Sequence, residues 1–326
     1  MRGAVTVMYY IGVDLGGTNL AAAVVTGDGK ILSRTSVSTP HGADRIADIM
    51  AATVRQAAAE AGLSLHAAAS VGIGSPGIAN PETGAVEYSN NLHFSNTPIA
   101  PMLSERLEGM PVYLENDAKA AALGEYAAGA GRGCRSMVVI TLGTGVGCGV
   151  IQDGRLLVGH NYAGAELGHF VMVMDGEPCT CGRRGCFEAY CSATALIRQT
   201  RRAMQAHPES LLWQVAGSLD AVNGRTVFDA REMGDPAAEE VFQFYVRALA
   251  CGLTSVVNIF QPELLCIGGG ICAQGETLLA PVREILDRED YARASAHRTK
   301  LVTAQLGNDA GLIGAALLPL YRFSKA

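Results

Sequence analysis

Apolar residues recur along this chain either in short or alternating runs typical of strands or at the spacing of a helix. Segments with these two patterns alternate. Apolar or alternating runs cover residues 9–13, 21–26 and 31–38, with glycine-containing turns between them. Short runs of this kind are typical of strands, so the segment predicts a three-stranded antiparallel meander. Residues 43–61 are instead rich in alanine, with larger apolar side chains at helical spacing, and Gly62 can end the helix that this pattern predicts.

The alternation continues to the end of the chain. We expect strands at 71–74, 112–115, 137–142, 147–151 and 264–267, and helices at 118–128, 192–206, 236–258 and 310–321. Strands that alternate with helices are typical of α/β proteins. The chain therefore predicts an α/β fold with a sizeable core, because 49% of its 326 residues are apolar.

A strand, a turn rich in glycine and threonine, and a second strand occur twice. The first turn is Asp14-Leu-Gly-Gly-Thr18, and the second contains Gly143-Thr144-Gly145, so the chain predicts a duplicated α/β unit. Backbone N–H groups of such turns can bind phosphate oxygens, and a threonine hydroxyl adds a donor. Either turn alone could be only a hairpin, and neither a GxxxxGK[ST] P-loop nor a Rossmann GxGxxG motif is present.

The charge of the chain argues against one class of partner. The formal charge is −6 and the isoelectric point is near 5.7, with no run of Lys or Arg, so we expect a small-molecule partner and no nucleic acid. No apolar signal region precedes Tyr9, and no uninterrupted apolar stretch is long enough to span a membrane. We therefore expect a cytoplasmic protein without a membrane partner, in a compartment that keeps thiols reduced.

Metal-ligand residue types cluster between Gly168 and Glu188. His169, Cys179, Cys181 and Cys186 offer one imidazole and three thiols, a donor set for one tetrahedral Zn²⁺ in a closed, structural site. The alternatives are disulfide partners or buried apolar thiols. A reducing compartment favours the metal, and the other six of the nine cysteines, which lie singly, are interpreted as packing residues.

Asp14 and Asp117 each follow a predicted strand. Asp14 precedes the first glycine turn, where its carboxylate could hold Mg²⁺ through water beside phosphates, or could cap its own turn. Asp117 precedes a predicted helix, so it could be an N-cap. It could also be a general base at the carboxyl edge of a sheet, where open α/β folds bind their ligands, and both roles could hold at once.

Taken together, these motifs resemble the ROK family of sugar kinases and repressors. The matching elements, in the order of the family, are Asp14–Thr18, Glu115-Asn116-Asp117-Ala118, Leu142-Gly-Thr-Gly-Val-Gly147, Glu166-Leu-Gly-His169, CxCGxxGCxE over 179–188 and Gly268-Gly-Gly270. They cover the chain from residue 10 to 321, and the ExGH element and CFEAYCSATAL resemble the bacterial glucokinase branch. Repressor members carry an N-terminal helix-turn-helix domain, which we do not expect because this chain starts almost at the first strand.

The resemblance implies an actin-like ATPase (ribonuclease H-like) fold, with two α/β domains about a cleft. The expected small domain comprises residues 9–118 and 307–326. The large domain comprises 119–306 and carries the segment from Gly168 to Glu188, here called the zinc loop. The implied reaction is in-line transfer of the ATP γ-phosphate to the 6-hydroxyl of glucose, with ATP as co-substrate, Mg²⁺, and Zn²⁺ in a structural role. Members are commonly dimers or tetramers, so we expect a homodimer or homotetramer that binds hexose and ATP.

The resemblance also implies roles for single residues, with Asp117 as the catalytic base. The implied sugar contacts are Gly74, Gly77, Asn91, Asn116, Asp117, Glu166, His169 and Glu188, and the implied nucleotide contacts are Asp14 near Mg²⁺, Gly16, Gly17, Thr18, Thr144, Gly145, Gly269 and Gly270. If one ring nitrogen of His169 binds Zn²⁺, the other can face a sugar hydroxyl. The metal would then orient Glu166, His169 and Glu188 toward the sugar.

Two positions depart from the family pattern. Lys119 stands where Asn is common, and we expect its side chain to point to solvent rather than to lower the pKa of Asp117. Cys148 stands where a further glycine is common, and we expect an effect on packing alone.

Other functions stay open. The chain could phosphorylate another hexose or an N-acetylhexosamine (N-acetylglucosamine, N-acetylmannosamine, fructose or allose), or use polyphosphate as donor. It could also be a sugar-sensing regulator without catalysis. The presence of Asp117 and of both glycine turns argues against the regulator, because a sensor needs neither.

Overall fold

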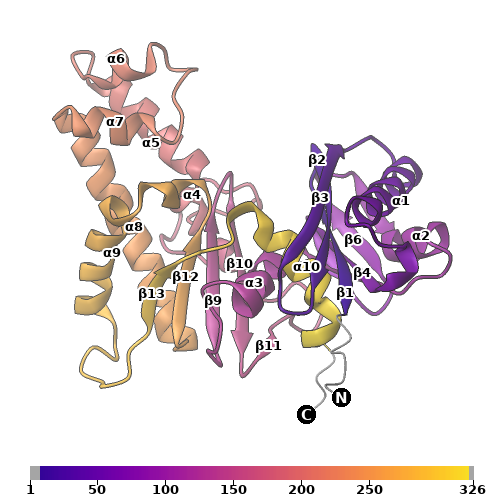
Figure 1. Cartoon of the computed structure of the whole chain (residues 1–326). Coiled ribbons are helices and arrows are strands. Elements are labelled where there is room, and N and C mark those ends of the chain that lie inside the picture. The colour runs from indigo at the N-terminus through magenta and orange to yellow at the C-terminus, as the bar shows by residue number, and fades with distance from the viewer. Residues whose placement is uncertain (1–7, 323–326) are drawn as a thin grey trace. The chain divides into compact units, whose positions relative to one another are not determined.

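The computed structural model of the chain describes residues 8–322 (Figure 1). These residues form two compact units, of which the first comprises 8–139, 149–165 and 304–322, and the second comprises 140–148 and 166–303. The first unit extends past residue 118, where the sequence analysis put a boundary, because helix α3 (Asp117–Ala128) packs on the C-terminal helix α10 (Ala310–Arg322).

A mixed sheet with the strand order β3-β2-β1-β4-β8 is the centre of the first unit. The strands β1 (Tyr9–Leu15), β2 (Asn19–Thr26) and β3 (Ile31–Ser38) are antiparallel neighbours, which confirms the predicted meander. β4 (Ala68–Ser75) lies parallel to β1, and β8 (Val112–Asn116) lies parallel to β4. β2 is buried along its whole length after its first residue, whereas β3 alternates between half-buried and exposed positions, as expected of an edge strand.

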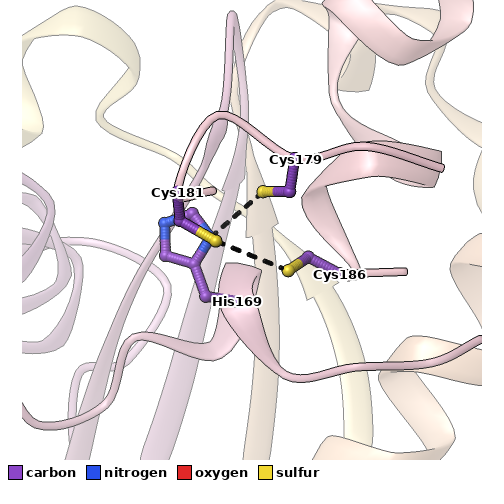
Figure 2. A group of neighbouring side chains, drawn as sticks. All are labelled: His169, Cys179, Cys181 and Cys186. Atoms are coloured by element: carbon purple, nitrogen blue, oxygen red, sulfur yellow. Dashed lines mark hydrogen bonds between the residues drawn. The ribbon is translucent and has the colours of Figure 1, made fainter. Parts of the chain in front are cut away.

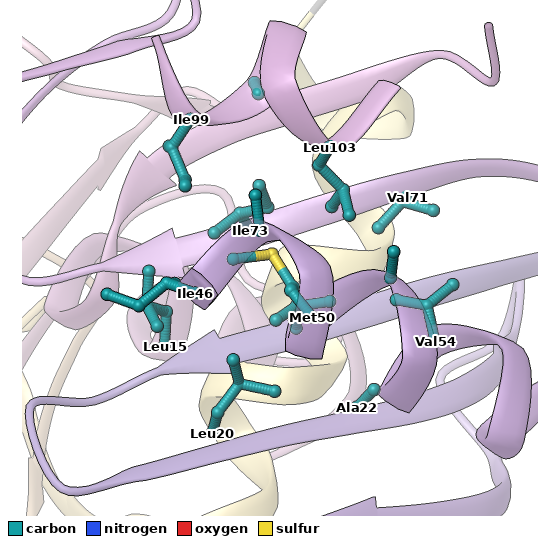
Figure 3. Packing of buried hydrophobic residues seen from close by; sticks show 14 of the residues in the cluster. Leu15, Leu20, Ala22, Ile46, Met50, Val54, Val71, Ile73, Ile99 and Leu103 are labelled. Carbon is teal, nitrogen blue, oxygen red and sulfur yellow. The ribbon is translucent and has the colours of Figure 1, made fainter. Parts of the chain in front are cut away.

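Helices cover both faces of this sheet. On one face, α1 (Ala43–Glu60) and α2 (Ile99–Arg106) contribute side chains such as Met50 and Leu103 to a buried apolar cluster with Ile73 of β4 (Figure 3). On the other face, the alternate residues of β1 and β2 pack against α10. The predicted helices at 43–61, 118–128 and 310–321 are confirmed within one or two residues at their ends.

Glycines let α10 approach the sheet and α3 through backbone contacts. A Cβ on Gly12 of β1 would lie 1.8 Å from the carbonyl oxygen of Leu312, and a Cβ on Gly72 of β4 would lie 1.8 Å from that of Ala315. On α10 itself, a Cβ on Gly314 would lie 1.7 Å from the carbonyl oxygen of Ala120. Since bonded side chains cannot occupy these spaces, only glycine permits this packing.

A second, small antiparallel sheet in the first unit was not predicted. It has the order β5-β6-β7 and consists of β5 (Ile78–Asn80), β6 (Ala85–Ser89) and β7 (Phe94–Thr97). Its strands are three to five residues long and carry Asn, Ser and Thr, so they show no apolar run that the period-two rule could detect. The turn from β6 to β7 contains Asn91.

Another sheet has the strand order β11-β10-β9-β12-β13. β9 (Met137–Leu142), β10 (Val146–Gln152) and β12 (Leu264–Gly268) confirm predicted strands, whereas β11 (Arg155–Leu156) and β13 (Lys300–Thr303) are too short to be predicted. The helices after β11 are α4 (Glu188–Cys191), α5 (Ala193–Ala206), α6 (Leu212–Ala216), α7 (Thr226–Glu232), α8 (Pro236–Phe260) and α9 (Glu276–Glu289). Short 3₁₀ helices are η1 (Leu65–Ala67), η2 (Leu167–His169), η3 (Gly270–Gln274) and η4 (Gly307–Asp309).

The longest described helix, α8, is a core helix. Among residues 8–322 it alone has the length and hydropathy of a membrane span, although the sequence analysis found no such stretch, and 61% of that window is buried inside the protein. Tyr245, Leu249 and Leu253 are fully buried. Its apolar composition is therefore explained by packing within the second unit.

Candidate active site and metal centre

The carboxyl ends of β1, β4 and β8 meet at one edge of the first unit's sheet. Parallel register pairs Asp14 with Gly74, and Gly74 with Glu115, which is followed two residues later by Asp117. A Cβ on Gly74 would lie 3.5 Å from the Cα of Asp117. The structure therefore brings Asp14, Gly74 and Asp117 together at the edge where open α/β folds bind ligands.

The Asp14 carboxyl group is largely buried, and burial is the main reason that its pKa rises to about 6. The nearby carboxylate of Asp117 raises the pKa further, whereas the Arg34 guanidinium lowers it. Arg34, which also pairs with Asp309 at 2.6 Å, is a site neighbour that the sequence analysis missed. A divalent cation would favour the charged form of Asp14, so the residue has the chemistry expected of a position near Mg²⁺.

Asn116, not Asp117, is the N-cap of α3. Its Oδ1 accepts a hydrogen bond from the backbone N–H of Lys119 at 3.1 Å, and its Nδ2 donates to the carbonyl of Gly77 at 3.1 Å. The N-cap alternative for Asp117 is therefore wrong. Gly77 has a φ of 103°, which favours glycine and keeps its carbonyl turned toward Asn116.

Asp117 is the first residue of α3, and its Oδ1 accepts the N–H of Ala118 at 2.8 Å. Burial raises the pKa of Asp117 above its ordinary value, against the backbone hydrogen bond from Ala118 and the side-chain bond from Asn116, which lower it. A carboxylate with a raised pKa accepts protons more readily. The position therefore has the electrostatics of a general base.

The first glycine turn joins β1 to β2. The N–H of Gly16 donates to the carbonyl of Asn19 at 2.9 Å, and the Thr39 hydroxyl donates to the carbonyl of Gly16 at 2.7 Å. A Cβ on Gly17 would lie 3.5 Å from the Cβ of Asn91, and both residues line a cavity of about 150 Å³. Asn91 is thus placed against the turn expected to bind phosphate.

The second glycine turn, in the second unit, is attached to the zinc loop by Glu188. The Glu188 Oε2 accepts the N–H of Val146 at 2.9 Å. Its Oε1 accepts the hydroxyl of Thr180 at 2.9 Å. A Cβ on Gly145 would lie 2.4 Å from the Glu188 Oε2, so a side chain there would displace the Glu188 carboxylate. Glu188 was predicted to face sugar, and here its carboxylate joins two loops.

The Gly268–Gly270 segment lies against the same turn. Gly269 has a φ of 92°, and a Cβ on it would lie 2.3 Å from the carbonyl oxygen of Leu142, the residue before the second turn. A Cβ on Gly270 would meet nothing within 4 Å. Gly145 and Gly269 therefore belong to one glycine-lined region, next to Thr144, whose carbonyl accepts the Thr194 hydroxyl at 2.8 Å.

The predicted metal ligands converge in the second unit (Figure 2). Ligand atoms of His169, Cys179, Cys181 and Cys186 all lie within 4.8 Å of one another. The Cys179 Sγ is 3.5 Å from the His169 Nδ1, and the Cys181 Sγ is 3.7 Å from the Cys186 Sγ. Zinc bonds of about 2.1 Å to nitrogen and about 2.3 Å to sulfur give tetrahedral edges of about 3.6 to 3.8 Å. The donor set therefore fits Zn²⁺.

Burial is the main reason that the pKa of the Cys186 thiol rises to about 12, and the neighbouring sulfurs of Cys179 and Cys181 contribute to the shift. A thiol of this kind stays protonated at neutral pH unless a cation binds the thiolate, which is what Zn²⁺ does. The described residues contain no disulfide, and Cys186 is fully buried. The four donors are therefore arranged for a metal ion, and the choice between metal and disulfide stays a prediction.

Aromatic packing ties the metal ligands to the second unit. Phe170 follows His169, Phe187 follows Cys186, and their rings stack with centroids 5.3 Å apart. Phe187 is fully buried and fits against Gly252 of α8, where a Cβ would lie 2.2 Å from its ring. His169, at the end of η2, and Cys186, just before α4, are thus held together by aromatic packing as well as by the arrangement of their donor atoms.

Glu166 and His169 lie at either end of η2. The His169 N–H donates to the carbonyl of Glu166 at 3.0 Å, and the Glu166 side chain is exposed. Because the His169 Nδ1 faces Cys179, the Nε2 is the ring nitrogen left for another partner. Asn91, Asn116 and Asp117 belong to the first unit, whereas Glu166, His169 and Glu188 belong to the second.

Lys119 and Cys148, the two residues that depart from the family pattern, both make contacts that we did not expect. Lys119 is only 1% exposed, and its ammonium donates to the carbonyl of Tyr162 at 2.6 Å, so the expectation that it points to solvent is wrong. Cys148 does more than pack, because its sulfur accepts the N–H of Leu167 at 3.0 Å. Thr180, which binds Glu188, was also missed, although its position between two cysteine ligands was a usable signal.

Comparison with known proteins agrees with the arrangement of these motifs. The ROK family matches residues 10–321, and the chain belongs to that family. A glucokinase of Thermotoga maritima is 41% identical over 310 residues, which cover 94% of this chain and 95% of that protein. An N-acetylmannosamine kinase of Citrobacter koseri is 35% identical over 314 residues, which cover 95% of this chain and 98% of that protein.

A solved structure extends the comparison to the fold. The structure of a ROK family glucokinase from Streptomyces griseus, in complex with glucose and AMPPNP, superposes with a TM-score of 0.80 at 38% sequence identity. The match covers 95% of this chain and 98% of that chain. The fold is thus the actin-like ATPase fold of ROK sugar kinases, which confirms the fold class expected from the motifs.

Proposed function

We propose that this chain is an ATP-dependent sugar kinase that transfers the γ-phosphate of ATP to the 6-hydroxyl of glucose. The observation that carries the proposal is the position of Asp117, which is half-buried at the carboxyl edge of the sheet beside Asp14. The 41% identity to a glucokinase over 94% of the chain supports glucose as the sugar.

Asp117 would accept the proton of the sugar hydroxyl as that oxygen attacks the γ-phosphorus in line. The N–H of Ala118 donates to the Asp117 Oδ1 and fixes that oxygen, so the Oδ2 can face the sugar hydroxyl. Exclusion of water on sugar binding would remove the molecule that otherwise competes as phosphoryl acceptor. Positioning and electrostatics carry most of the acceleration in phosphoryl transfer.

The sugar and nucleotide contacts would be those implied by the family motifs. In the first unit, Asn91 and Asn116 would bind sugar hydroxyls, and the backbone of Gly16 to Thr18 would bind phosphate. In the second unit, Glu166 and the His169 Nε2 would bind sugar, and Thr144, Gly145, Gly269 and Gly270 would bind nucleotide. Bound Mg²⁺ would neutralise phosphate charge near Asp14.

Zinc would have a structural role. Held by His169, Cys179, Cys181 and Cys186, it would fix the ring of His169 so that the Nε2 faces the sugar. Glu188 gives the same loop a second connection, because its carboxylate binds the N–H of Val146 beside the second glycine turn. The zinc loop would thus support nucleotide contacts as well as sugar contacts.

The cellular setting follows from the same chemistry. Three cysteine ligands and six further cysteines without disulfides suit a reducing cytoplasm. A homodimer or homotetramer is the assembly proposed from the family resemblance, and sedimentation analysis would test it.

N-acetylmannosamine is the alternative sugar, because a kinase for it is 35% identical over 95% of the chain. Coupled-assay kinetics over glucose, N-acetylmannosamine, N-acetylglucosamine, fructose and allose, with ATP and then polyphosphate as donor, would decide between them. We expect the highest kcat/KM for glucose with ATP. A higher value for an N-acetylhexosamine would contradict the proposed sugar, and no turnover with any pair would contradict the kinase assignment.

Asp117→Asn tests the base directly. We expect the variant to bind glucose with near-normal Kd while turnover falls by roughly 10² to 10⁴, because the amide keeps the shape of the carboxylate but accepts no proton. Isothermal titration calorimetry and steady-state kinetics measure the two effects. Near-normal turnover would remove Asp117 from the mechanism.

A further inference from the structure

The segment from Val158 to Ala165 leads into Glu166 and has a closed, strained backbone. Its neck is closed by the N–H of Gly164, which donates to the carbonyl of Val158 at 2.9 Å. Within it, Tyr162 and Ala165 have φ values of 63° and 62°. This left-handed conformation is unfavourable for residues with a Cβ, and it persists only when the surroundings hold it.

Lys119 supplies such a restraint within the first unit. Its ammonium reaches the carbonyl of Tyr162 at 2.6 Å, and the side chain is 1% exposed. The backbone at Lys119 also packs closely against Gly149, because a Cβ on Gly149 would lie 3.3 Å from the Lys119 Cα. A buried hydrogen bond from a charged donor is among the stronger ones in proteins. Lys119 therefore holds Tyr162, one of the two strained residues of the segment.

Cys148 restrains the chain after Ala165, within the second unit. The N–H of Leu167 donates to the Cys148 sulfur at 3.0 Å, and the cysteine is buried. Leu167 begins η2, which ends at the zinc ligand His169. Glu166 thus lies between a residue held by Lys119 and a residue held by Cys148, the two positions that depart from the family pattern.

We infer that Lys119 and Cys148 are positioning residues that fix the backbone on either side of Glu166 and so set the affinity for sugar. This inference rests on the proposed function, because it assigns Glu166 to sugar binding. Neither residue is required to touch the substrate. A loss of either restraint lets the strained backbone relax and moves Glu166, which weakens sugar binding without changing the base.

Lys119→Met tests the inference, since methionine keeps an unbranched apolar side chain close to the length of the lysine stem but donates no hydrogen bond. We expect the KM and the calorimetric Kd for glucose to rise about tenfold, while kcat and the KM for ATP stay within about threefold. A role in folding alone would reduce the active fraction and thus kcat, but would leave the KM of the folded molecules unchanged. Lys30→Met, at an exposed lysine in the same unit, is the matched control.

A second substitution that relieves the backbone strain tests the inference more specifically. Ala165→Gly removes only a methyl group and lets residue 165 adopt its left-handed conformation at little cost. In the Lys119→Met background it should restore most of the lost glucose affinity, whereas alone it should change the KM less than about twofold. An unchanged glucose KM in Lys119→Met, or no recovery in the double variant, overturns the inference.

The outcomes for the two proposals are distinct. If the unaltered protein binds glucose but phosphorylates no hexose, the proposed kinase function fails, and the ratio of calorimetric Kd values still tests the positioning role. If Lys119→Met yields no folded protein, Cys148→Ala, with Cys251→Ala as control, makes the same test from the second unit. A glucose Kd unchanged in Cys148→Ala then overturns the inference.

Discussion

At the scale of single residues, the site combines carboxylates whose charge the protein disfavours. Burial raises the pKa of both Asp14 and Asp117, and the Asp117 carboxylate adds to the shift of Asp14. A folded protein that holds an aspartate with a raised pKa loses stability as the pH rises through the range between the unfolded and folded pKa values. The site therefore costs stability at neutral pH, as functional sites commonly do.

Asp14→Asn should recover that cost. With a folded pKa of about 6 against an ordinary value of 3.8, Asp14 should cost the unaltered protein roughly 2 to 3 kcal/mol of stability between pH 4 and pH 7. The variant should be more stable than the unaltered protein at pH 7 by about that amount, and the difference should shrink toward pH 4. Urea unfolding at both pH values measures it, with the exposed Asp153→Asn as control. A gain of equal size at both pH values would contradict the pKa shift.

At the scale of elements, the zinc loop is joined to more of the site than its four ligands indicate. Thr180, between Cys179 and Cys181, donates to Glu188, and Glu188 accepts the N–H of Val146 next to the second glycine turn. Loss of the metal would release both connections, because structural zinc sites contribute directly to folding energy.

Cys181→Ser should therefore affect both substrates. We expect one zinc per chain in the unaltered protein and none in the variant, with KM values for glucose and for ATP each raised at least about tenfold. Metal analysis by plasma mass spectrometry and steady-state kinetics measure the two effects, and Cys251→Ser, at an exposed cysteine outside the cluster, is the control. A zinc-free variant with normal KM values for both substrates would show that the loop does not position the site.

At the scale of the whole molecule, helix α10 completes the first unit by backbone contact. Gly314→Ala would place a methyl group 1.7 Å from the carbonyl oxygen of Ala120, so we expect a loss of at least about 2 kcal/mol in the free energy of unfolding. Gly311→Ala in the same helix meets its nearest atoms at 3.5 Å and should change stability by less than about 1 kcal/mol. Chemical denaturation compares them, and equal stabilities would contradict the close packing.

The sequence predicted what is local and left out what depends on distant partners. Long periodic segments such as α1 and α8, and the cysteine spacing, could be recognised within a short window. The burial of Lys119 depends on Tyr162, 43 positions later, and the position of Glu188 depends on Val146, 42 positions earlier. The spacing of apolar residues along the chain does not indicate contacts between residues so far apart in the sequence. The strands β5 to β7 were missed for a different reason, because their polar residues carry no apolar signal.

The return of the C-terminal helix to the first sheet has a consequence for synthesis on the ribosome. Tyr10, Ala21 and Val25 are made early, but the residues that cover them, Leu312 and Leu317 among others, are made last. At roughly 5 to 20 residues per second, one apolar face of the nascent sheet stays uncovered for roughly 15 to 60 s. The first unit to be translated is thus the last to be completed, and chaperones that shield apolar strands have that interval in which to act.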